Sequence, residues 1–175
     1  MTDFSNQNGD SEKFLEIFFN YEKQIYYEAK YVLRDEQLAE DVVQEVCYRM
    51  LKYFHRIEES TEYERKAYIK KITRSAVTDI LRQNLKFNLL PEDISLENFT
   101  NFQSDNSTEN IVIFNEDMKT LKKLSKKYSR ILILRLIYYL SFKEIACIEK
   151  ITASAARKRF ERGKRMAQNK LKILR

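Results

Sequence analysis

The stretch SFKEIACIEKITASAARKRFERGKR, residues 141–165, has the pattern of two short helices around a tight turn. Ser141 and Glu144 have the spacing of a capping box, which predicts a helix that begins at Ser141. Residues 149–152 form a short break, after which Thr152 can cap a second helix. This order of caps and break predicts a helix-turn-helix.

The second of these helices is expected to be apolar on one side and basic on the other. Ala156, Phe160 and Gly163 recur at helical spacing on the inner side. The opposite side carries four cations: Arg157, Lys158, Arg162 and Arg165. A helix with an apolar back and a cationic front after a tight turn is typical of DNA recognition in the major groove.

The composition predicts an all-α fold of two small helical domains. The 175 residues include two Gly and one Pro, too few for the turns of a sheet protein. A hydrophobic content of 43% is enough for a core. The chain has no apolar run long enough to span a bilayer and no signal-peptide pattern, so we expect a cytoplasmic protein without stable membrane insertion.

Residues that commonly carry catalysis or metals are scarce. We interpret Cys47 and Cys147, which stand beside apolar residues on expected helices, as buried thiols rather than disulfide or metal ligands. His55 is the only histidine, which leaves little material for a metal site or for catalysis. No nucleophile–base set, phosphate-binding loop or metal cluster is visible, so we expect neither an enzyme nor a cofactor.

The net charge of +6 conceals four blocks of alternating sign. Residues 1–64 carry 7 basic and 15 acidic residues, a net of −8, and residues 65–85 carry a net of +5. Residues 86–117 are net −6, and residues 118–175 carry 18 basic residues against three Glu, a net of +15. Two basic blocks separated by an acidic one predict two contacts with a polyanion.

Periodicity predicts three helices in the N-terminal half, after a frayed tail over residues 1–10. Asp35 should cap the second helix, and Thr61 with Glu64 should open the third as a capping box. Between them, residues 54–60 are expected to form a loop. The expected helices span residues 11–33, 36–53 and 61–84.

Helical spacing also predicts which residues face inward. The apolar face of the second helix includes Val42, Val46, Met50 and Leu51. On the third helix, five apolar residues should face inward and five polar ones outward; the outward set is Lys70, Lys71, Arg74, Thr78 and Arg82.

The middle of the chain breaks this pattern. Residues 86–110 contain the only proline and many Asn, Ser, Thr and acidic residues, and a stretch this long without periodicity predicts a linker. Two more helices are expected at 115–125 and 129–140. The predicted domains are therefore residues 11–85 and 115–175, joined by an acidic linker over residues 86–114.

Three stretches resemble the bacterial sigma factors of the extracytoplasmic-function (ECF) group. AEDVVQEVCYRM, residues 39–50, is similar to a helix of that family's region 2, and YIKKITRSAVTDILR, residues 68–82, to the helix that follows. SFKEIACIEKITASAARKRFERGKRMAQNKL, residues 141–171, resembles region 4. The resemblance implies a non-enzymatic subunit that joins core RNA polymerase, recognises promoter DNA and helps to open it.

The resemblance also implies partners and sites. The expected partners are the β′ and β subunits of core RNA polymerase, promoter DNA and, in many members, an anti-sigma factor. The face expected to dock on the clamp helices of β′ consists of Asp41, Gln44, Glu45 and Tyr48, whose acids and carboxamide can pair with basic and polar groups.

In the family, the helix that corresponds to residues 61–84 of this chain reads the −10 element. The cations suited to its phosphates are Lys66, Lys70, Lys71, Arg74 and Arg82. Tyr63 and Tyr68, with Phe54 and His55, lie in or near the loop that captures an unstacked base, although Tyr68 can equally belong to the core. Ser75 stands where the family commonly has Asn, which leaves the −10 preference open.

In region 4, the positions that read the −35 element are Ser154, Arg157, Lys158, Glu161 and Arg162. Arg can bind guanine in a bidentate manner, and Glu can accept from cytosine N4. Lys150 replaces the usual Gly of the turn, so we expect left-handed strain there. The acidic linker resembles the segment that threads the polymerase RNA channel.

A stand-alone helix-turn-helix regulator of transcription is the main alternative. The face from Asp41 to Tyr48 and the two separate basic blocks argue against it. A helical adaptor that binds only protein would leave the +15 block unexplained. Binding to core RNA polymerase separates the sigma-factor interpretation from all of these.

Overall fold

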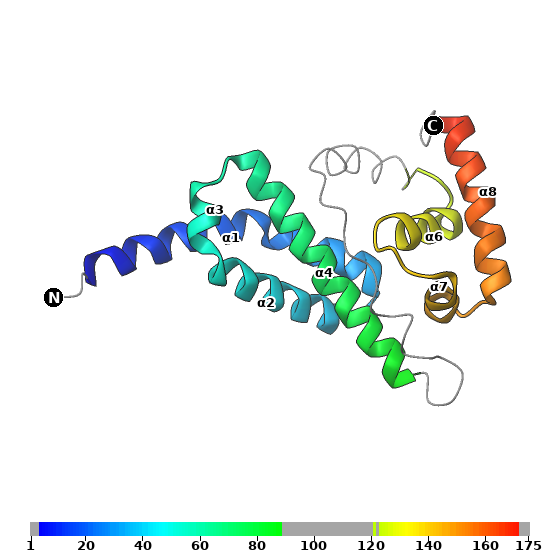
Figure 1. Cartoon of the computed structure of the whole chain (residues 1–175), viewed down its shortest axis with the longest axis horizontal. Coiled ribbons are helices and arrows are strands. Elements are labelled where there is room, and N and C mark those ends of the chain that lie inside the picture. The colour runs from blue at the N-terminus through cyan, green and yellow to red at the C-terminus, as the bar shows by residue number, and fades with distance from the viewer. Residues whose placement is uncertain (1–3, 89–120, 122, 172–175) are drawn as a thin grey trace. The chain divides into compact units, whose positions relative to one another are not determined.

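The structure is a computed structural model that describes residues 4–88, 121 and 123–171, and the regular secondary structure of these residues is helical (Figure 1). The chain divides into two compact units, Met1–Arg82 and Gln83–Arg175. The predicted all-α fold class is confirmed. Most of the predicted linker, and most of the helix expected over residues 115–125, lie outside the described residues.

The first unit is built on two antiparallel helices, α1 (Phe4–Leu33) and α2 (Glu36–Lys52), joined by a two-residue turn. Their facing sides bury Ile25 and Val32 of α1 and Val42 of α2. The predicted cap is confirmed, because Asp35 Oδ1 accepts a hydrogen bond from the Leu38 backbone N at 3.0 Å. A side-chain oxygen at this position satisfies an N–H that has no partner within the helix.

The start of α1 differs from the prediction. The helix begins at Phe4 instead of residue 11. Although residues 5–10 are polar apart from Gly9, none of them is a proline that would remove a backbone donor. The polar composition of these residues was therefore not enough to predict where α1 begins.

The segment predicted as a loop contains a short helix, α3 (Phe54–Glu59). The Phe54 ring meets the Phe14 ring of α1 edge-on, with centroids 5.5 Å apart, and Ile57 is buried. The two side chains are three residues apart, so a helical turn places both on the same side of α3. Tertiary packing thus imposed a helix that the local sequence did not predict.

Most of the next helix, α4 (Glu62–Asn88), belongs to this unit, and the helix extends four residues past the predicted end. Its predicted capping box is confirmed: Glu64 Oε2 accepts from the Thr61 backbone N at 2.9 Å, and Thr61 Oγ1 accepts from the Glu64 backbone N at 3.3 Å. Two ion pairs, Arg49–Asp79 and Arg74–Glu28, join α4 to α2 and α1.

Two residues lie on the opposite side from the one predicted. Leu51 is 58% exposed, because it is three residues after the exposed Tyr48 and seven after the exposed Gln44. Lys70 is buried, because Thr73 and Val77 of the same helical stripe both pack into the core.

The second unit packs α6 (Lys126–Leu136), α7 (Phe142–Glu149) and α8 (Ala153–Leu171) around one core. A helix was expected over residues 129–140, but α6 begins at Lys126 and ends at Leu136, and a turn with Tyr139 at φ 52° follows. The apolar residues of this turn, Ile137, Tyr138 and Leu140, are buried all the same. The apolar pattern in the sequence therefore continued past the end of α6, because the residues of the turn are buried as well, and the predicted helix was too long.

The predicted helix-turn-helix is present as α7 and α8. Ser141 and Glu144 form both bonds of the capping box, with the Ser141 backbone N donating to Glu144 Oε2 at 2.6 Å. Thr152 Oγ1 accepts from the Ala155 backbone N at 3.1 Å and caps α8. Lys150 adopts the left-handed conformation, with φ 51° and ψ 49°, as its position predicted.

Two contacts fix this unit. A Cβ added to Gly163 would lie 3.2 Å from Leu132 Cδ1, so the absent side chain lets α8 approach α6 closely. Arg130 of α6 forms an ion pair with Glu149 at the end of α7, and both side chains are almost completely buried. This ion pair ties the first helix of the helix-turn-helix to α6.

Both cysteines are free and partly exposed, so the prediction of buried thiols holds only in part. None of the helices in the described part of the chain combines the length and the apolar content that a membrane span needs.

Candidate nucleic-acid and partner interfaces

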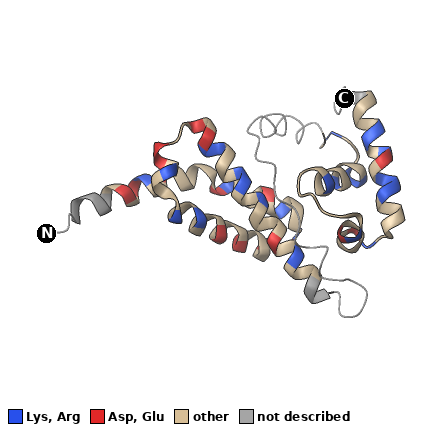
Figure 2. Cartoon of the chain, viewed as in Figure 1, with Lys and Arg blue, Asp and Glu red and all other residues tan. Residues whose placement is uncertain are grey.

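The outer face of α8 carries all five residues expected to read DNA bases. Ser154, Arg157, Lys158, Glu161 and Arg162 are exposed, and their helix shows basic residues along its length (Figure 2). Ala156 and Gly163 face the core instead. The helix therefore has the apolar back and the cationic front that major-groove recognition requires.

Arg157 is held by an aromatic neighbour that the sequence pattern did not reveal. Its guanidinium carbon lies 5.4 Å from the centroid of the Phe142 ring, and that of Arg135 lies 5.0 Å from the same ring. Phe142 meets Phe160 edge-on at 5.5 Å. Cation–π contacts restrict the rotamers of Arg157, so less conformational entropy is lost when it binds.

The polar face of α2 is accessible. Asp41 and Gln44 are exposed, and Tyr48 is 62% exposed. Leu51 continues the same stripe, although the sequence assigned it to the core. Large apolar side chains within an exposed polar stripe are typical of a protein-binding surface.

Glu45 differs from its neighbours because it is already paired. Its Oε1 accepts from Arg49 Nε at 2.7 Å, and Arg49 Nη2 donates to Asp79 Oδ2 of α4 at 3.2 Å. Ser75 donates to the same Asp79 oxygen at 3.5 Å. The expected partner-binding face and the Ser75 position are thus joined by three side-chain contacts.

The cations expected to bind −10 phosphates do not form one surface. Lys66 and Lys71 are exposed, whereas Lys70 is buried. Arg74 Nε lies 3.7 Å from Glu28 Oε1 of α1, and both side chains are largely buried. Arg82 is half-buried. Two of the five, Lys66 and Lys71, are exposed at the surface.

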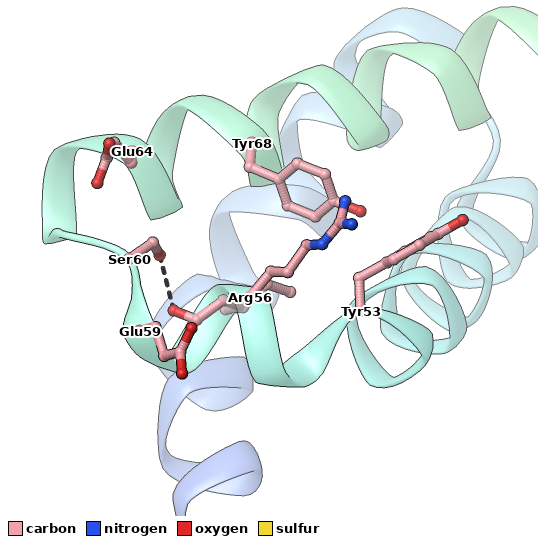
Figure 3. A pocket seen from close by; sticks show the side chains of 7 residues that line it. Tyr53, Arg56, Glu59, Ser60, Glu64 and Tyr68 are labelled. Carbon is pink, nitrogen blue, oxygen red and sulfur yellow. Dashed lines mark hydrogen bonds between the residues drawn. The ribbon is translucent and has the colours of Figure 1, made fainter.

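A pocket of about 730 Å³ lies where α3 meets the start of α4 (Figure 3). Of the tyrosines singled out from the sequence, Tyr68 lines the pocket, and Tyr63 is exposed outside it. The sequence analysis did not identify Tyr53 or Arg56, because helical spacing does not predict which residues at or before α3 meet α4. The lining residues are Tyr53, Arg56, Ile57, Glu59, Ser60, Glu64 and Tyr68.

The pocket has a rigid wall and a protonated phenol. Arg65 donates through Nε to the Ile57 carbonyl at 3.1 Å and through Nη2 to the Ser60 carbonyl at 3.0 Å, which fixes the turn between α3 and α4. Burial, with a smaller contribution from Tyr53, raises the pKa of Tyr68, although Arg49 and Arg56 act in the opposite direction. Tyr68 therefore keeps its proton at neutral pH and can donate a hydrogen bond.

Known families match both units. The model of sigma-70 region 2 matches residues 17–86, and the model of sigma-70 region 4 matches residues 118–166, which together make up more than half of the chain. Among solved structures, a sigma factor RpoE in complex with the anti-sigma factor NepR from Bartonella quintana is 18% identical. The match covers 94% of this chain and 98% of that one, with a TM-score of 0.38, which is too low to bear on function. No curated protein matches the chain.

Proposed function

This chain belongs to the sigma-70 family and is a sigma factor, a protein of promoter recognition. We propose that it acts as members of the ECF group do, docking on core RNA polymerase through α2 and reading promoter DNA through α4 and α8. Catalysis then belongs to the polymerase, and this chain supplies specificity and helps to open the duplex. An anti-sigma factor is a further partner that the resemblance to the ECF group implies.

The accessible face of α2 is the observation that carries polymerase docking. Asp41, Gln44 and Tyr48 are exposed on a helix whose other side is core, and Leu51 extends the stripe. A regulator that needed only a helix-turn-helix would have no use for such a surface. Acidic and amide groups around an exposed aromatic ring suit a basic helical partner such as the β′ clamp.

The pocket between α3 and α4 supports a role in opening the −10 element. Two tyrosine rings, Tyr53 and Tyr68, border a space that an unpaired base can enter. Stacking of a base on an aromatic ring contributes roughly 1–3 kcal/mol, which offsets part of the cost of unstacking it. Lys66 and Lys71 can hold phosphates of the separated strand.

The face of α8 supports recognition of the −35 element. Arg157 and Arg162 are exposed there and can bind guanine, and Glu161 can accept from cytosine N4. The contact with Phe142 restricts the rotamers of Arg157 before DNA binds. Lys158 and Lys164, both exposed on the same helix, suit phosphates.

Capture by core RNA polymerase tests the proposal. Changing Asp41, Gln44 and Glu45 together to Ala should abolish binding of the chain to immobilised core enzyme while its helix content stays the same. The matched control changes two acids and one glutamine on the exposed side of α1, Glu12, Glu16 and Gln24, to Ala, and it should bind as the unchanged protein does. Unchanged core affinity of the α2 variant would contradict the docking role. A chain that binds DNA alone but never core enzyme would be a stand-alone regulator instead.

A further inference from the structure

Three polar groups of the pocket between α3 and α4 already have partners. Ser60 Oγ donates to the Ile57 carbonyl at 2.7 Å, as Figure 3 shows. Glu64 Oε2 accepts from both the backbone N and the hydroxyl of Thr61. Glu59 Oε1 lies 3.4 Å from His55 Nε2. These groups line the pocket, but they already contact other residues of the protein when no ligand is bound.

Arg56 differs from these groups, as do the hydroxyls of Tyr53 and Tyr68. No described residue accepts a hydrogen bond from its guanidinium group, although that group lines the pocket. In Figure 3 the side chain points toward the Tyr68 ring, and Tyr53 stands on its other side. A guanidinium offers five N–H donors in one plane, and two of them can bind a pair of neighbouring acceptors at once.

The four bases differ in whether they offer such a pair. Guanine has O6 beside N7, and cytosine has O2 beside N3, so each presents two adjacent acceptors. Adenine places its N6 amino donor beside N7 and N1, and thymine places its N3–H between two carbonyls. A guanidinium aligned with adenine or thymine would therefore set donor against donor and leave one contact unmade.

We propose that Arg56 is the specificity-determining residue of this pocket and that it selects guanine or cytosine over adenine and thymine at the unstacked −10 position. The inference rests on the proposed promoter-recognition function. Tyr53 and Tyr68 hold any base by its faces, and Arg56 distinguishes bases by their edges. The pocket is then a site of sequence readout as well as of strand capture.

The test uses holoenzyme reconstituted from the full chain and core RNA polymerase. The probe is a pool of single-stranded DNA with a randomised segment, from which bound molecules are selected and sequenced. Holoenzyme with the unchanged chain should prefer G or C at one position by about fivefold or more. Arg56→Gln should remove the preference at that position alone. Arg56→Lys should do the same, because it keeps the charge but lacks the planar fork.

A control and a modified base sharpen the result. Lys23→Gln removes one exposed cation of α1 in the same unit and should leave every preference unchanged. If guanine is the selected base, 7-deazaguanine should lower binding to the level of the Arg56 variants, because it lacks the N7 acceptor. If cytosine is selected instead, replacing it with thymine should have that effect, because thymine has no adjacent pair of acceptors.

The outcomes separate this inference from the proposed function. If Arg56→Gln weakens binding to all sequences equally, Arg56 is a phosphate anchor and the inference is wrong. If the variants enrich the same sequences as the unchanged chain, the inference again fails, although promoter recognition stands. If the unchanged holoenzyme enriches no sequence at all, the proposed function fails and the inference falls with it.

Discussion

Removing one partner of the Arg130–Glu149 ion pair should destabilise the second unit strongly. The Arg130 and Glu149 side chains are 6% and 11% exposed, so water cannot replace a lost partner. Glu149→Ala would leave the Arg130 guanidinium buried opposite a gap. The expected defect is therefore one of folding, which abolishes −35 recognition indirectly.

The magnitude follows from the burial of both charges. Breaking a buried pair by removing one member costs about 3–5 kcal/mol, since the remaining charge stays desolvated. A whole domain is stable by only about 5–15 kcal/mol, so this loss would remove a large part of the stability of the unit. Replacing both residues with apolar ones, as in Arg130→Met with Glu149→Leu, should cost far less and can be close to neutral.

Urea unfolding of the full chain, followed by circular dichroism, measures these effects as a double-mutant cycle. The control is Lys13→Ala, which breaks the exposed Lys13–Glu58 pair of the first unit and should leave stability essentially unchanged. The reasoning would be refuted if Glu149→Ala cost less than about 1 kcal/mol, because the charge left behind would then be hydrated. It would also fail if the double variant lost as much as the two single variants combined.

Three other predictions follow from single residues. Hydrogen bonds from the Thr61 hydroxyl and backbone N hold the pKa of Glu64 below its ordinary value of 4.5, so its contribution to stability is complete above pH 4.5 and is lost as the pH falls through the lowered pKa. Glu64→Gln should therefore reduce the fall in melting temperature on acidification below that pH, and an unchanged acid profile would contradict this. Lys150→Gly should raise the stability of the second unit by about 1 kcal/mol in a urea titration, because Gly adopts a φ of 51° without strain; a decrease would mean that the Lys side chain contributes to packing. Arg162→Ala should relax specificity at one base pair of a selected −35 sequence by about 1–3 kcal/mol, whereas Lys164→Ala should weaken all sequences alike and lower the salt slope by about one unit. Binding measured across single-base variants and salt concentrations separates the two, and a uniform loss for Arg162→Ala would make it a phosphate contact.

Local signals predicted the starts of α2, α4, α7 and α8 and the turn of the helix-turn-helix. Asp35, the Thr61–Glu64 box and the Ser141–Glu144 box all act within four residues of chain, so their bonds form wherever the helix forms. The left-handed conformation of Lys150 is also local, because the turn demands it whichever residue occupies the position. The segregation of charge likewise predicted the basic face of α8.

The burial of a side chain was less predictable where its residue type and its neighbours on the same helix face indicate opposite sides. Leu51 and Lys70 were assigned by residue type, and both lie on the side that their type disfavours. Their neighbours at i−3, i−7, i+3 and i+7 decide the matter, because residues at this spacing share a face. Of the phosphate-binding candidates on α4, Arg74 turned inward toward Glu28 for a reason that no local pattern contains.

The sequence by itself therefore determined the caps that open α2, α4, α7 and α8 and the kind of surface that α8 presents, because each depends on residues close together in the chain. Only the tertiary structure decided that α3 exists, that Tyr53 and Arg56 share a pocket with Tyr68, and that Phe142 holds Arg157. The contacts of Tyr68 and of Phe142 join residues 12 to 15 positions apart, and the contact of α3 with α1 joins residues 40 positions apart. Periodicity describes the faces of one helix, whereas the meeting of two helices depends on how the whole core packs.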